Sequence, residues 1–146
     1  MLNAQEKPTV IYFIRHAEKA DLSKDPDLSE AGAARAQSWA GWFKDKGIVA
    51  VYSTGYKRTM ETARPIAEQE RLDILTYDPR NPDLENIINH HKGLSIVIVG
   101  HSNTIPNYVN QLIGEKKYTD INESEYGSLY TVTNYSDKVT HALKKI

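Results

Sequence analysis

The chain has 146 residues, 40% of them hydrophobic and 25% charged, a composition typical of one globular domain over residues 1–146 with room for a real core. Eighteen basic and nineteen acidic residues give a net charge of −1, which excludes a broad electrostatic field for nucleic acid or an anionic membrane. The absence of cysteine excludes disulfides, thiolate catalysis and cysteine zinc sites.

The N-terminal residues carry no hydrophobic signal core, and no apolar run in the chain approaches the length of a membrane span. Ala4-Gln5 nevertheless has the small-polar character of a junction left after signal removal. We therefore expect a cytoplasmic protein by default, or an exported, periplasmic one if a signal peptide was trimmed before this junction. The sequence leaves the oligomeric state open.

Apolar runs predict four buried strands. The first, at residues 10–14, consists of consecutive β-branched or aromatic residues without polar alternation, as in a parallel sheet covered on both faces. Similar runs follow at residues 48–52, 73–77 and 95–99, the third being the weakest.

Helical patterns separate these strands. Ser29 is a plausible N-cap for a helix whose apolar residues recur at helical spacing up to Phe43. A second helix begins near Lys57, and Pro65 should kink or restart it. Shorter helical patterns cover residues 84–88 and 105–112.

Two alternating segments, residues 129–133 and 139–143, flank Ser136-Asp137 and are typical of a β-hairpin. Strands that alternate with helices and end in a hairpin predict an α/β fold. We expect a three-layer α/β/α sandwich with a mostly parallel central sheet and a C-terminal antiparallel hairpin.

Polar side chains follow three of the predicted strands at the point where each strand ends. In open α/β sheets, ligands bind at this edge. Helix N-termini and arginines together favour an oxyanion, because backbone N–H groups, the helix dipole and a bidentate guanidinium all attract it. The residues are Arg15 and His16, Ser53 and Arg58, and His101 and Ser102.

These stretches resemble the histidine phosphatase superfamily, also called phosphoglycerate mutase-like. The signature after the first strand is Arg15-His16-Ala17-Glu18, and the resemblance continues in DLSEAGAARAQ, YSTGYKRTMETA and VGHSN. The motifs occur in the family's order and cover nearly the whole chain.

The resemblance implies that His16 is a nucleophile that forms a phosphohistidine intermediate. Arg15, Arg58 and His101 would then surround the phosphoryl oxygens, with a contact from the backbone N–H of Ser102. An unprotonated imidazole can attack phosphorus without a metal, while guanidinium and imidazolium groups offset charge on the oxygens. The expected enzyme is a metal-independent phosphatase without a cofactor, and its partner is a phosphorylated small molecule or a phosphohistidine protein.

The chain departs from the family pattern in two respects. It lacks the large insertions of the mutases and acid phosphatases, so it is most similar to the short bacterial SixA-type phosphohistidine phosphatases. It also lacks the glutamate motif that many members use as a general acid. Glu18 and then Asp78 are the favoured candidates for the proton donor, with Asp83 and Glu85 as further ones.

Two other classes of function remain open at this stage. A metal-dependent hydrolase would use His16, Glu18, Asp78 and His101 as ligands. A non-catalytic phosphoryl-binding module would retain the pocket without turnover. His90 and His91 close a helix and are expected at the surface. Substrate recognition would fall to the loops at residues 20–27 and 115–127.

Overall fold

The computed structural model describes residues 7–146, so the Ala4-Gln5 junction lies outside the described residues. In chain order the elements are β1 (Thr9–Arg15), α1 (Glu30–Phe43), β2 (Ile48–Ser53), α2 (Lys57–Gln69), β3 (Ile74–Thr76), α3 (Leu84–His90), β4 (Ser95–Gly100), α4 (Thr104–Ile113), β5 (Ser128–Asn134) and β6 (Val139–Lys145).

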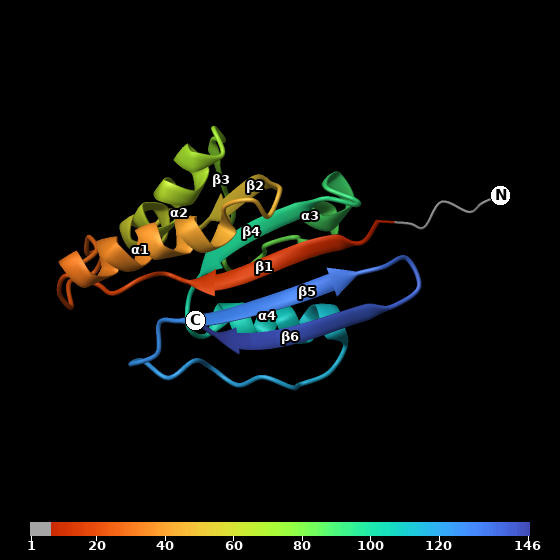
Figure 1. The fold of residues 1–146 in the computed structure, drawn as a ribbon. Coiled ribbons are helices and arrows are strands. Elements are labelled where there is room, and N and C mark those ends of the chain that lie inside the picture. The colour runs from red at the N-terminus through yellow and green to blue at the C-terminus, as the bar shows by residue number, and fades with distance from the viewer. Residues whose placement is uncertain (1–6) are drawn as a thin grey trace.

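The strands form one mixed sheet in the order β3-β2-β4-β1-β5-β6 (Figure 1). The pairs β3–β2, β2–β4 and β4–β1 are parallel, whereas β5 runs antiparallel to both β1 and β6. This confirms the predicted α/β fold, with its mostly parallel sheet and C-terminal antiparallel hairpin.

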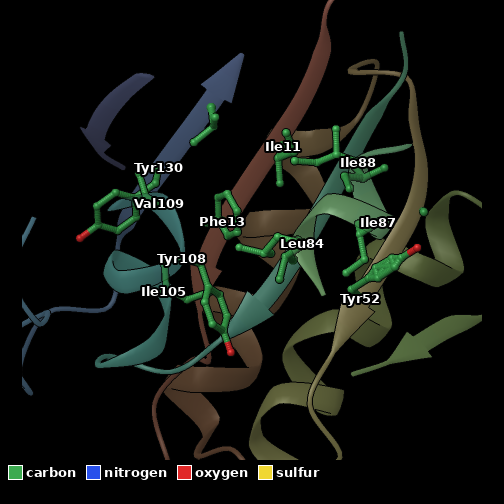
Figure 2. Packing of buried hydrophobic residues seen from close by; sticks show 14 of the residues in the cluster. Ile11, Phe13, Tyr52, Leu84, Ile87, Ile88, Ile105, Tyr108, Val109 and Tyr130 are labelled. Carbon is green, nitrogen blue, oxygen red and sulfur yellow. The ribbon is translucent and has the colours of Figure 1, made fainter. Parts of the chain in front are cut away.

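Each face of the sheet packs against helices, which gives the expected three layers. On one face, α3 and α4 enclose a cluster that includes Ile11 and Phe13 of β1, with Leu84 and Tyr108 from the two helices (Figure 2). Complete burial of one such side chain stabilises the fold by about 1.5–3 kcal/mol.

A second cluster lies on the opposite face, beneath α1 and α2. Trp39 and Phe43 of α1 stack there with ring centroids 5.9 Å apart, and Ile66 of α2 is fully buried beside them. The apolar spacing identified in the sequence is therefore the buried face of α1.

The register of the two central strands determines where the functional residues lie. Arg15 is paired with Gly100 at the carboxyl ends of β1 and β4, so that both strands finish level with each other. His16 and His101 follow these residues directly and lie side by side, with ring centroids 5.7 Å apart. The sheet therefore brings together two histidines that are 85 residues apart in the sequence.

Helix α2 runs through Pro65 as one continuous element, so the proline does not restart it. Proline has no N–H and removes one hydrogen bond from the helix, but packing of the neighbouring Ala63 and Ile66, both fully buried, holds the segment against the sheet. Within residues 7–146, no helix is sufficiently long and apolar to cross a membrane.

The first turn of α1 lies unusually close to the segment that follows His16. Ser29 caps the helix by accepting a hydrogen bond from the N–H of Gly32, and its own N–H donates to the Glu18 carbonyl at 2.9 Å. A Cβ atom at Gly32 would come within 2.2 Å of that carbonyl oxygen. Only glycine therefore permits this approach.

We predict that Gly32→Ala lowers the free energy of unfolding by about 2–3 kcal/mol, because backbone atoms must move to admit the methyl group. Gly41→Ala, in the same helix, should raise it by about 0.5–1 kcal/mol, because a Cβ there meets no atom within 4 Å and alanine is the better helix former. Urea unfolding measures both changes. Equal stability of the two variants would contradict the close approach.

Candidate active site

A cavity of about 370 Å³ opens at the carboxyl ends of β1 and β4. It receives residues from β1, from the starts of α2 and α4, and from the loops after β3 and α4. The residues that line it are Arg15, His16, Lys19, Tyr56, Arg58, Pro79, Arg80, His101, Ser102, Asn103, Thr104 and Glu123. Five sequence-predicted residues, Arg15, His16, Arg58, His101 and Ser102, thus share one cavity.

The imidazole of His16 is held in a single tautomer. Its Nδ1 lies 2.8 Å from the carbonyl oxygen of Ala17, and because a carbonyl can only accept, Nδ1 carries the proton. Nε2 then holds the lone pair, and within residues 7–146 it has no hydrogen-bond partner. Such a nitrogen is available to attack an electrophile in the cavity.

The His16 ring is also uncharged. Burial is the main cause that lowers the pKa of His16 to about 3, while the hydrogen bond to Ala17 opposes this effect. Positive charge on Arg15 and Arg58 lowers the pKa further. At neutral pH the ring therefore retains its lone pair.

His101 is oriented by a buried pair of threonines. The Thr59 hydroxyl donates to the Thr54 carbonyl at 3.0 Å, so its oxygen is free to accept from the Thr54 hydroxyl at 2.7 Å. The Thr54 oxygen then accepts from Nε2–H of His101 at 2.9 Å. With Nε2 protonated by this series of hydrogen bonds, Nδ1 of His101 holds a lone pair, the second in the site after that of His16.

Burial lowers the pKa of His101 to about 4, and the charges of Arg58 and Arg15 add to this effect. The ring is therefore neutral at neutral pH, whereas the sequence comparison predicted an imidazolium. An oxyanion in the cavity would supply the missing negative charge and favour proton uptake at Nδ1.

Arg15 is the most constrained of the cations. Its side chain is 1% exposed, and its Nη1 donates to the carbonyls of Asn122, Glu123 and Glu125 at 3.3, 3.0 and 2.7 Å. Nη2 forms an ion pair with the Glu123 carboxylate at 3.2 Å, and the Tyr126 ring lies 4.2 Å from the guanidinium carbon. The connection from α4 to β5 thus returns to the end of the sheet where β1 finishes (Figure 1).

Arg58 enters the cavity from the first turn of α2, with its guanidinium carbon 4.6 Å from the centre of the Tyr56 ring. Its backbone carbonyl accepts from the Thr62 hydroxyl, which in turn accepts from the N–H of Ala17. These bonds connect the segment after β1 to α2, so that His16 and Arg58 are positioned by the same contacts.

Both arginines contain a buried nitrogen without a partner. In the described part of the chain, the buried side-chain nitrogen or oxygen atoms that lack a hydrogen bond are Nε of Arg15, Nε of Arg58 and Nε1 of Trp39. Buried polar atoms are normally paired, and each unpaired one costs about 1–3 kcal/mol. Two of the three belong to arginines that line the cavity, although these Nε atoms themselves are buried.

Glu18 does not line the cavity. Arg35 of α1 donates to both of its carboxylate oxygens, at 2.8 and 3.0 Å. Partial burial acts to raise the pKa of Glu18, but the hydrogen bonds from Arg35 lower it overall, so the carboxyl is ionised. These contacts argue against Glu18 as a proton donor and give it a structural role between β1 and α1.

Asp78 is also absent from the cavity wall. Its carboxylate is half exposed and accepts from the backbone N–H of Arg80 at 2.9 Å. Asp83 and Glu85 likewise do not line the cavity. Ser102 does, and its hydroxyl donates to the Glu123 carboxylate at 3.4 Å.

Sequence reasoning missed several side chains of the site, among them Tyr56, Lys19, Arg80 and Glu123 in the cavity wall and Tyr126 against Arg15. Of the two loops expected to recognise substrate, residues 115–127 contribute Glu123, whereas residues 20–27 contribute no lining residue. The sequence around Tyr56 and Tyr126 is that of ordinary aromatic residues in loops, so it does not indicate that either ring packs against an arginine.

His91 differs from the surface histidine that we expected. Its Nε2 shares a hydrogen bond of 2.8 Å with the Tyr52 hydroxyl, while the adjacent His90 is exposed. Among residues 7–146, no three His, Asp or Glu side chains gather in a way that could hold a metal ion.

Comparisons with known proteins identify relatives by sequence and by fold. Residues 11–80 match the family model described as the histidine phosphatase superfamily, branch 1. A protein of Proteus mirabilis named "Probable phosphoglycerate mutase GpmB" is 33% identical over 82 residues, which are 51% of this chain and 38% of that protein. The chain therefore matches well under half of the length of this relative.

Solved structures share the whole fold at low sequence identity. A mycobacterial glucosyl-3-phosphoglycerate phosphatase in complex with VO3 has a TM-score of 0.78 at 12% identity, covering 94% of this chain and 98% of that one. The protein histidine phosphatase SixA in complex with tungstate has a TM-score of 0.73 at 18% identity, covering 93% and 96%. Phosphoserine phosphatase of Entamoeba histolytica follows, with a TM-score of 0.72 at 15% identity, covering 92% and 95%.

The neutral buried histidines predict an acid-sensitive fold. Their pKa values lie near 3 and 4 in the folded chain and near 6.5 when unfolded, so the unfolded chain binds more protons between these limits. Stability should be complete above about pH 6.5 and fall as the pH decreases, by up to about 1.4 kcal/mol per pH unit for each histidine.

Urea unfolding of wild type, His16→Asn and His101→Asn from pH 7.5 to 4.5 measures this slope, which each variant should flatten. His90→Asn is the matched control, because His90 is exposed in the fold. Parallel slopes in all four proteins would contradict the burial of neutral rings.

Proposed function

Because the chain belongs to the histidine phosphatase superfamily, we propose that it is a phosphatase that hydrolyses a phosphomonoester or a phosphohistidine through a phosphohistidine intermediate on His16. The observation that carries this proposal is the neutral imidazole of His16, whose Nε2 lone pair is free while Nδ1–H is bound to Ala17. Arg15 and Arg58 line the same cavity at the edge of the sheet.

In the first step, Nε2 of His16 attacks phosphorus and the bond to the leaving group breaks. Nδ1–H donates to the Ala17 carbonyl throughout, so the positive charge that forms on the ring is stabilised and the ring keeps its orientation. In the second step, water attacks the phosphorus of the intermediate and His16 is the leaving group. No proton has to be removed from His16 before the attack, because the ring is already neutral.

Arg58 and Arg15 are placed to stabilise charge on the phosphoryl oxygens. Both arginines line the cavity, and so does His101, whose Nδ1 holds a lone pair. A phosphoryl group would accept hydrogen bonds from guanidinium N–H groups and would draw a proton onto His101. Interactions made in this way strengthen as charge accumulates on the oxygens in the transition state.

The substrate is a phosphorylated small molecule or a phosphohistidine on a protein. The cavity volume of about 370 Å³ suits a phosphoryl group with a small part of its carrier, and Lys19 and Arg80 extend the positive lining beyond the two central arginines. Two structural neighbours are complexes with VO3 and with tungstate, which supports an oxyanion as the kind of ligand that this cavity binds.

We predict that His16→Ala lowers the rate of 4-nitrophenyl phosphate turnover by at least about 10³-fold, since the displacement has no other nucleophile. The variant should still fold, because His16 lies at the end of β1 rather than in either apolar cluster. Wild type quenched during turnover should carry an acid-labile phosphoryl group on His16, detected by mass spectrometry of peptides. Full activity in His16→Ala would contradict the assignment of the nucleophile.

Turnover should survive a chelator and be inhibited by vanadate, which adopts the trigonal-bipyramidal geometry of the transition state. Rates with and without chelator, and a vanadate titration of wild type and Arg58→Lys, measure both effects. Arg58→Lys should bind vanadate more weakly, because a point charge replaces a planar fork of donors. Loss of activity on chelation, restored by zinc or manganese, would favour a metal-dependent hydrolase, and vanadate binding without turnover would favour a binding module.

A further inference from the structure

Glu123 is the acidic side chain of the cavity. Among the lining residues found within residues 7–146, Arg15, Lys19, Arg58 and Arg80 are cationic, and Glu123 is the one carboxylate. Its side chain is 80% exposed, so its carboxylate faces the open side of the cavity rather than the protein interior. A group that reaches a leaving group has to lie on this open side, because the reacting phosphoryl group itself occupies the inner end beside His16.

The Glu123 carboxylate is held between two elements of the site. Oε2 accepts from Nη2 of Arg15 at 3.2 Å, and Oε1 accepts from the hydroxyl of Ser102 at 3.4 Å. The backbone beneath it is fixed as well, since its own carbonyl accepts from Arg15 and the N–H of Ile121 donates to the Ser102 carbonyl at 2.9 Å. The Glu123 carboxylate is therefore exposed, while the loop that carries it is held in place by hydrogen bonds.

A bound phosphoryl group would change the charge around Glu123. The oxyanion takes hydrogen bonds from Arg15, so the carboxylate loses its share of that cation and gains a negative neighbour. The carboxylate then lies beside the oxyanion at the mouth of the cavity, where the leaving group departs.

We propose that Glu123 is the proton donor to the leaving group, an inference that rests on the proposed phosphatase function. As the bond between phosphorus and the leaving oxygen breaks and the bond to Nε2 of His16 forms, the carboxyl proton passes to the leaving oxygen and leaves Glu123 ionised. In the second step the carboxylate accepts a proton from the water that attacks phosphorus, and His16 departs with the lone pair on Nε2. The proton is thus returned and the cycle closes.

Two substrates that differ by one methylene group test this role. Nitrophenolate is a stable anion and departs without a proton, whereas the alkoxide of 4-nitrobenzyl alcohol requires one in the transition state. We expect Glu123→Gln to lower kcat/KM for 4-nitrobenzyl phosphate by about 10²-fold or more, because kcat/KM reports the step in which the leaving group departs. The kcat/KM for 4-nitrophenyl phosphate should change by only a few fold.

Asp120→Asn is the matched control, since Asp120 is an exposed carboxylate on the same loop that does not line the cavity. It should leave both rates unchanged. Glu123→Asp retains a carboxyl group and should recover part of the lost rate with the benzyl substrate.

An equal loss of kcat/KM for both substrates in Glu123→Gln would overturn the inference, because a residue that only positions Arg15 affects every leaving group alike. A lower KM with unchanged kcat in Glu123→Gln would also overturn the inference. It would show that Glu123 competes with the phosphoryl group of the substrate for Arg15. Failure of wild type to turn over either substrate would overturn the proposed function and this inference with it. If wild type is active, His16→Ala is inactive and Glu123→Gln affects both substrates equally, the inference alone is overturned.

Discussion

The arrangement of the site depends on the buried guanidinium of Arg15. A cation with 1% exposure needs hydrogen-bond partners, and three carbonyls of the α4–β5 connection accept from Nη1 of Arg15. The contact holds the α4–β5 loop over the end of β1, although the two are more than a hundred residues apart in the sequence. The same contact places Glu123 at the mouth of the cavity. The shape of the pocket therefore depends on the order of this loop.

The site carries an energetic cost within an otherwise consistent fold. Burial keeps His16 and His101 neutral, and among residues 7–146 the buried Nε atoms of Arg15 and Arg58 have no hydrogen-bond partner. Such departures from good pairing are expected where a protein is built to bind something. Part of the free energy that the apolar layers provide thus maintains a binding site that is prepared before its ligand arrives.

Local patterns in the sequence were sufficient to predict most of the fold. Each buried strand is an uninterrupted apolar run, and a polar residue at the end of such a run lies at the ligand-binding edge, which is why His16 and His101 could be placed together. Glu123 could not be predicted, because it lies in a loop without periodicity and its position is set by a bond to Arg15. Glu18 was favoured as the proton donor from local sequence alone. Its distance from His16 in the sequence is short, but Arg35 on α1 directs its carboxylate away from the cavity.

The uneven charge of the cavity also affects how quickly a substrate arrives. Arg15, Lys19, Arg58 and Arg80 face one carboxylate, whereas the chain as a whole has a net charge of −1. The attraction is therefore local, and it extends over roughly the Debye length, about 8 Å at physiological ionic strength. An anionic substrate is guided during the last part of its approach, its association rate falls as salt is added, and a long polyanion gains no extended surface on which to bind.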